Sequence, residues 1–110
     1  MIGGMAAENL PDESAITDAL RSVEDPEAGM NIVELGLVYR TEVVDGRVEV
    51  DMTMTTPACP VADMLVEQSR SAVQGICPPG TEVKVQLVWE PIWNPAMMSE
   101  VARAFFGWRG

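Results

Sequence analysis

The sequence LVYRTEVVDGRVEVDMTM, residues 37–54, decides the fold of this chain. Apolar and polar residues alternate on both sides of Asp45-Gly46, a dipeptide that is typical of the tight turn between two antiparallel strands. In the second half of the stretch, valine and methionine alternate with glutamate, aspartate and threonine, so one face of this strand should be buried and the other solvated. The stretch therefore predicts a β-hairpin with one face in water.

Helical patterns lie on both sides of this hairpin. Upstream, apolar residues recur at helical spacing over residues 14–23, with Asp12 or Ser14 as a candidate cap and Pro26 as the stop. Downstream, a second helix is expected to begin with Pro60 at its first position and to end before a Pro-Pro-Gly run.

The rest of the chain predicts a third strand and a last helix. Residues 83–87 alternate again between apolar and polar. Asn94 is expected to cap a helix that starts at Pro95 and stops at Gly107. Its expected inner face consists of Met98, Val101, Ala102 and Phe105. The order α-β-β-α-β-α predicts an α+β fold, a small antiparallel three-stranded sheet with helices packed on one face.

Length and charge restrict the class of protein. The 110 residues predict one domain over residues 12–110, preceded by a loose arm over residues 1–11. The net charge is -10, from 7 basic and 17 acidic residues, so neither nucleic acid nor an anionic membrane surface is an expected partner. No apolar run has the roughly 18 residues of a membrane helix, and the first residues lack a signal-peptide pattern. We therefore expect a cytoplasmic protein.

Cys59 is the residue most suited to chemistry. If Pro60 opens a helix, Cys59 takes the N-cap, where the helix dipole and unpaired amides favour the thiolate, which is both nucleophile and metal ligand. Thr55 and Thr56 precede it and could donate hydrogen bonds to sulfur, whereas Asp63 opposes a second negative charge. The alternative is a buried cysteine that behaves as a small hydrophobic residue.

Two further groups are candidates with competing interpretations. Asp25, Glu27 and Glu34 could bind a hard cation or do acid–base work, but their spacing alone favours helix-end capping and a solvated turn. Trp89 and Trp93 flank a proline-containing turn and could form either a partner surface or plugs in the core.

A count of cysteines limits what the chain can hold. A stable iron–sulfur cluster usually takes four thiolates, and this chain has only Cys59 and Cys77 and no histidine. Cys77 has no C-x-x-C partner, and we assign it no role. We therefore expect no permanently bound cofactor, only a transient iron or iron–sulfur cluster, held briefly or bridged between subunits.

Three motifs resemble the MIP18-type iron–sulfur cluster assembly domain family, to which SufT and PaaD proteins belong. DPEAGMNIVELGLVY, residues 25–39, resembles its opening signature. TMTTPACP, residues 53–60, resembles its cysteine loop. VWEPIWNP, residues 88–95, followed by Met98-Ser99, resembles its tail motif. Ala28 and Ile92 depart from the usual pattern, which has a larger aliphatic residue and a proline there.

The resemblance implies a small accessory protein for maturing iron–sulfur proteins, often dimeric, with an essential loop cysteine. It carries that role onto Cys59 and makes Asp25 and Glu27 expected site residues, followed by Thr56 and Glu34. The expected partners are the assembly machinery, apo client proteins and a second copy of the chain. The absence of a cysteine-rich extension favours a SufT-like protein over a PaaD-like factor for an aromatic-degradation oxygenase.

Three modes of action remain open from the sequence. Cys59 could ligate iron, a cluster or a client thiol, which is the carrier interpretation. The chain could instead be a non-catalytic adaptor that recruits clients through its tryptophan loop. A thiol enzyme is the weakest interpretation, because the chain has no histidine to act as the base.

Overall fold

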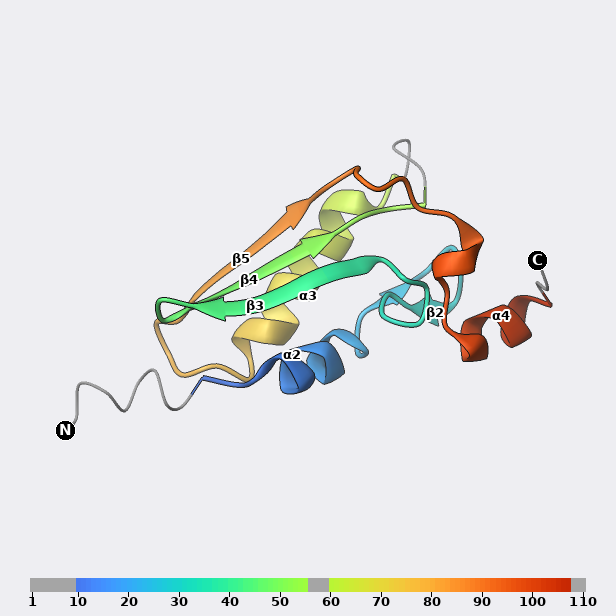
Figure 1. Ribbon diagram of the computed structural model, residues 1–110. Helices are drawn as coiled ribbons and strands as arrows, with labels where there is room; N and C mark the ends of the chain where they lie inside the picture. Colours follow the sequence, from blue (N-terminus) through green and yellow to red (C-terminus); the bar gives the residue numbers. More distant parts are fainter. Residues whose placement is uncertain (1–9, 56–59, 108–110) are drawn as a thin grey trace.

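The computed structural model describes residues 10–55 and 60–107 as a sheet with helices packed against one face and a short tail at one end (Figure 1). The elements in chain order are α2 (Glu13–Leu20), β1 (Glu24–Asp25), β2 (Met30–Asn31), β3 (Val38–Val44), β4 (Arg47–Met52), α3 (Ala62–Gln74), β5 (Glu82–Leu87), the 3-10 helix η1 (Pro95–Met97) and α4 (Glu100–Phe106). The predicted α+β class is confirmed. None of the described helices has the length and apolar character needed to cross a membrane.

The predicted hairpin forms as β3 and β4, which pair antiparallel. Asp45 and Gly46 take φ angles of 51° and 77°, the left-handed values that a two-residue turn needs. Every second residue of β4 is buried, beginning with Val48. On the opposite, solvated face, the Arg40 guanidinium bonds Asp51 and Glu49 at 3.0 Å each. The binary pattern therefore predicted the buried face of β4 correctly.

The direction of the third strand differs from the prediction. β5 lies on the far side of β4 and runs parallel to it, so the sheet is mixed and not all antiparallel. The reason is the connection, because α3 carries the chain across the face of the sheet and returns it to the end where β4 began. A separate two-stranded antiparallel ribbon, β1–β2, lies beyond the end of the sheet.

One of the two predicted caps is right for α2, and the predicted first residue of α3 is wrong. Asp12 caps α2 by accepting from the Ala15 amide at 2.8 Å, as expected. α3 begins at Ala62 with Val61 as its N-cap, so Pro60 lies outside the helix and is not its first residue. The φ and ψ of Val61, -106° and 14°, are not helical, so α3 begins only at Ala62. Cys59 therefore precedes the N-cap of α3, and it lies outside the described residues.

The tail is divided into two short helices where one was expected. Asn94 caps η1, and a new N-cap, Ser99, starts α4. Met98 and Ala102 are buried as predicted, but Val101 and Phe105 are 64% and 62% exposed. The break at Ser99 rotates α4 relative to the expected helix, so these two side chains face outward.

Candidate functional site

An apolar pocket of about 390 Å³ lies where the tail meets the β1–β2 ribbon and the end of β4. Its lining residues are Ala28, Leu35, Thr55, Trp93, Pro95, Met98, Phe106 and Gly107. Six of them come from the three sequence motifs and lie up to 70 positions apart in the chain, from Ala28 to Met98. Phe106 and Gly107 come from the end of α4. The fold thus brings the opening signature, the start of the cysteine loop and the tail motif together at one place.

Asp25 builds the turn that carries Ala28 to this pocket. Its side chain is 5% exposed, and its Oδ1 accepts from the Glu27 amide at 2.9 Å. Its backbone carbonyl accepts from the amides of Ala28 and Gly29 at 3.1 and 2.8 Å. Gly29 allows the turn to close because its φ is 70°. Asp25 therefore acts as a turn builder here, and Glu27 points its carboxylate into solvent from an exposed position.

Glu34 fastens the tail to the first motif. One carboxylate oxygen accepts from the Ser99 hydroxyl, and the other accepts from Arg21 Nε at 3.2 Å. The Ser99 amide also donates to the Glu34 carbonyl at 2.9 Å, while the Ser99 hydroxyl caps α4 by accepting from the Ala102 amide. The Ser99 hydroxyl, and after it Arg21, holds the pKa of Glu34 below its usual range. Both oxygens of this carboxylate therefore accept hydrogen bonds from other parts of the chain.

The two tryptophans have different places. Trp93 is half-buried, lines the pocket and donates its indole N–H to the Leu35 carbonyl at 2.8 Å. Trp89 is 40% exposed and does not line the pocket. The sequence left open whether the two tryptophans form a partner surface or fill the core. In the structure, Trp89 is on the surface and Trp93 packs against the core.

Sequence reasoning missed Tyr39, which holds the tail from the strand side. Its hydroxyl donates to the Pro91 carbonyl at 2.8 Å, and the Met97 sulfur lies 3.3 Å from the same oxygen. Burial raises the pKa of Tyr39, which keeps this donor protonated. The only available signal was a tyrosine at the end of the opening signature, and strand alternation explained it without any further role.

The cysteine loop is described on its two flanks. Thr55 is exposed and lines the pocket, and Pro60 is exposed on the other side. Two predicted site residues, Thr56 and Cys59, lie outside the described residues.

The described residues alone do not provide a metal site. Within residues 10–55 and 60–107, no group of three or more histidine, cysteine, aspartate or glutamate side chains could hold an ion. Cys77 lies three residues beyond the end of α3, and burial raises the pKa of its thiol, which disfavours the thiolate form that binds metals.

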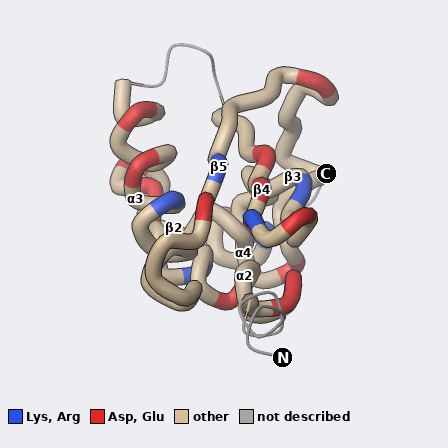
Figure 2. The backbone as a smooth tube through the Cα atoms, turned by 90° about the vertical axis from the view of Figure 1, so that its left-hand side faces the viewer, with Lys and Arg blue, Asp and Glu red and all other residues tan. Residues whose placement is uncertain are grey.

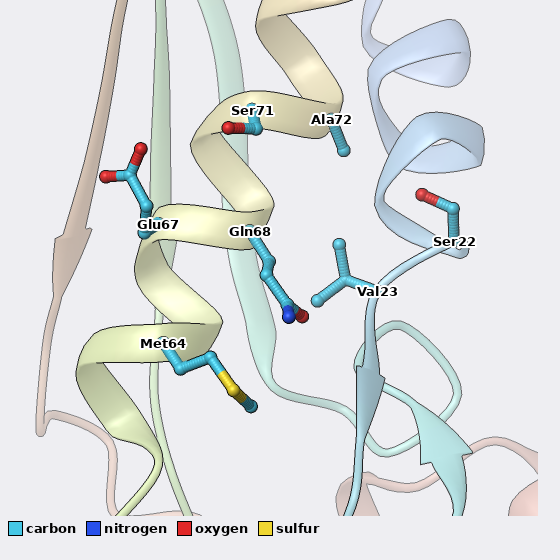
Figure 3. Close-up of a pocket in the computed structure, with 7 residues that line it drawn as sticks. All are labelled: Ser22, Val23, Met64, Glu67, Gln68, Ser71 and Ala72. Atoms are coloured by element: carbon cyan, nitrogen blue, oxygen red, sulfur yellow. The ribbon is translucent and has the colours of Figure 1, made fainter.

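A larger and more open groove carries none of the predicted site residues. It has a volume of about 600 Å³ and lies between α3 and the segment that follows α2. Figure 3 shows the Gln68 side chain reaching from α3 toward Val23, with Met64 one turn away on the same helix; Ser22 and Ser71 also line the groove. Because the three motifs meet elsewhere, we take the smaller apolar pocket as the candidate site.

Comparisons with known proteins agree on one protein family. The model of the family described as "Iron-sulfur cluster assembly protein" matches residues 13–87. An Fe-S protein maturation auxiliary factor of Porphyromonas gingivalis is 44% identical over 94% of this chain and 98% of its own length. The Fe-S protein maturation auxiliary factor SufT of Staphylococcus aureus is 41% identical over 77% of this chain and 97% of its own length. A crystal structure of a domain of unknown function, DUF59, from Bacillus anthracis has a TM-score of 0.80 and 35% identity, covering 88% of this chain and 92% of that one.

Proposed function

The chain belongs to the iron–sulfur cluster assembly protein family, and from this premise we propose that it is a maturation factor that carries iron or a cluster at Cys59 to client proteins. Its role in iron–sulfur assembly is accessory, as it is for the full-length relatives. The 41% identity to the SufT protein of Staphylococcus aureus favours general maturation over a PaaD-like role in aromatic degradation.

The convergence of the three motifs on one pocket carries the proposal. Thr55 is the last described residue before the cysteine and lines the pocket beside Trp93. Cys59 is four positions after Thr55 in the sequence, so chain geometry limits the separation of their Cα atoms to about 14 Å. A client segment seated in the pocket would therefore be within reach of whatever Cys59 holds.

The ligand count supports a carrier more than a storage protein. The chain offers one cysteine in this region, and a stable cluster usually needs four thiolates. The other ligands would come from the client or from a second copy of the chain. In transfer, the Cys59–iron bond breaks as a client thiolate bonds to the same iron, with no net change in oxidation state. The weak single attachment makes release easy, which suits a carrier.

Spacing alone favoured a turn role for the acidic group, and the family resemblance made Asp25 and Glu27 expected site residues. Asp25 shapes the turn, and Glu27 supplies an exposed carboxylate beside the pocket, which could supplement Cys59 as a hard oxygen ligand. Glu34 holds the tail. The proposal assigns no catalytic residue, since the chain has no histidine to act as a base. It places the protein in the cytoplasm, where thiols stay reduced.

Anaerobic reconstitution with ferrous iron and sulfide tests the proposal. The wild type should gain visible sulfur-to-iron absorbance, Cys59→Ser should gain almost none, and Cys77→Ser should match the wild type. Equal absorbance in the wild type and Cys59→Ser would refute the role of Cys59. A wild type that stays colourless and still binds assembly partners would point to the adaptor mode instead.

A further inference from the structure

The chemistry of the pocket identifies the kind of partner that it accepts. Its walls are almost entirely carbon, from Leu35, Pro95, Met98 and the rings of Trp93 and Phe106. The polar atom of the indole is not available to a guest, because the Trp93 N–H already donates to the Leu35 carbonyl. A guest that fits must therefore bury an apolar group.

The apolar surface continues outside the pocket along α4. Phe106 lines the pocket and is 42% exposed, and the neighbouring Phe105 packs edge-on against it with ring centroids 5.0 Å apart. Phe105 and Val101, one helical turn apart, are 62% and 64% exposed. A small free ligand would fill the pocket and leave this strip in water. A polypeptide segment would cover both, with one side chain inside and its neighbours along α4.

The charges around the pocket give the partner a sign. Glu27 is adjacent in sequence to the lining residue Ala28, and Glu100 is two positions beyond Met98. Both carboxylates are exposed, and neither forms an ion pair with another described residue. Against these two acidic residues, α4 carries one basic residue, Arg103, which is half-buried. Acidic positions also recur on α3 and on the sheet (Figure 2), in keeping with the net charge of -10. An approaching segment gains most if lysine or arginine flanks its apolar anchor.

We propose that this pocket docks a partner polypeptide through one bulky apolar side chain flanked by basic residues. The inference deepens the proposed function, on which it rests, by giving the chemistry of the protein that meets the chain at this site. The same surface is a poor fit for a second copy of this acidic chain, whose charge would oppose its approach.

NMR titration of the full chain with a designed peptide tests the inference. The probe is an acetylated pentapeptide amide with phenylalanine between two pairs of lysines. It should produce saturable shifts at the Ala28 and Met98 methyl groups and at the Trp93 indole N–H. Replacing its phenylalanine by alanine should weaken binding about tenfold to a hundredfold, the effect of losing one buried aromatic side chain. Replacing its lysines by glutamates should weaken binding several-fold, and added salt should remove that difference.

Variants of the chain localise the binding. Phe106→Ala should weaken binding of the lysine peptide about tenfold, and Ala28→Leu, which adds bulk at the pocket wall, should do the same. Met64→Ser, at a similarly exposed apolar position in the larger groove, should bind as the wild type does. Shifts that fail to saturate, or binding that Ala28→Leu and Phe106→Ala both leave unchanged, would overturn the inference. Iron loading of the wild type is measured separately. If the chain loads iron at Cys59 but does not bind the peptide, this inference is wrong and the proposed function stands.

Discussion

The indole N–H of Trp93 donates a hydrogen bond of 2.8 Å to the carbonyl of Leu35, a residue 58 positions earlier in the chain. This bond joins the tail motif to the opening signature at the wall of the candidate pocket. Together with the Glu34–Ser99 contact, it fixes a tail that has few regular backbone bonds of its own. The site therefore depends on side chains that connect distant parts of the sequence.

Trp93→Phe should test this connection. The variant keeps an aromatic ring and loses the donor, which leaves the Leu35 carbonyl without its partner. We expect a loss of about 1 kcal/mol in the free energy of unfolding, the usual net value of one hydrogen bond. Urea denaturation measures it, with Trp89→Phe, at an exposed position off the pocket, as the matched control. An equal effect of the two substitutions would contradict the assignment.

Gly36 should tolerate no side chain, because the tail packs directly on it. A Cβ added there would lie 2.4 Å from the Met97 carbonyl oxygen, and its φ of 77° is unfavourable for alanine. Gly46 has the same φ, but a Cβ there meets nothing within 4 Å. Gly46→Ala should thus lose about 1 kcal/mol from backbone strain alone, and Gly36→Ala should lose considerably more.

Thermal melts of both glycine variants separate backbone strain from the steric clash with the tail. The difference between their melting temperatures reports the clash, and Gly36→Ala should also change the tryptophan fluorescence because Trp93 lies in the displaced tail. Melting temperatures that match would mean that the tail does not rest on Gly36.

Much of the fold could be predicted because it rests on local patterns. The alternation around Asp45-Gly46 specifies the hairpin, and Asp12 specifies the start of α2. The parallel direction of β5 could not be predicted from its own residues, because alternation reports burial and not strand direction. The rotation of α4 was missed for a related reason: Ser99 was seen only as part of a motif, although it is an N-cap that interrupts the helical register.

The candidate site was only partly predictable, because its members act through contacts between distant segments. The place of Asp25 before a proline already favoured the turn that the structure shows. Residue type identified Trp93, but nothing in its spacing could show that it lines a pocket. Ala28, Leu35 and Phe106 were missed as pocket residues, since isolated apolar side chains resemble core positions in any sequence.

Glu34 should make stability depend on pH in a defined direction. Its pKa is lowered from 4.5, so its stabilising effect is complete above that pH and is lost as the pH falls through the lowered value in the folded state. Glu34→Gln should therefore be less stable than the wild type at pH 7 by about 1 kcal/mol, and the gap should shrink at acidic pH. Urea denaturation from pH 7 to pH 3 measures the gap. Glu82→Gln, on an exposed strand position, serves as the control, and a gap for Glu34→Gln that is constant with pH would contradict the assignment.

Asp25 offers a test of turn building against metal binding. An asparagine oxygen can still accept from the Glu27 amide, so Asp25→Asn should stay within about 0.5 kcal/mol of the wild type, while Asp25→Ala should lose about 1 kcal/mol or more. If the carboxylate only shapes the turn, Asp25→Asn should also load iron normally. Loss of iron loading in a fully stable Asp25→Asn variant would instead make the charge itself part of the site.

The central claim is that Cys59 hands iron or a cluster to a client, and the rate of client activation tests it most directly. The chain is loaded anaerobically and mixed with the apo form of an enzyme that requires a [4Fe–4S] cluster, and recovered activity is followed with time. The wild type and Cys77→Ser should activate the enzyme at the same rate, and Cys59→Ser should do no better than free iron and sulfide. Activation by Cys59→Ser at the wild-type rate would contradict the account.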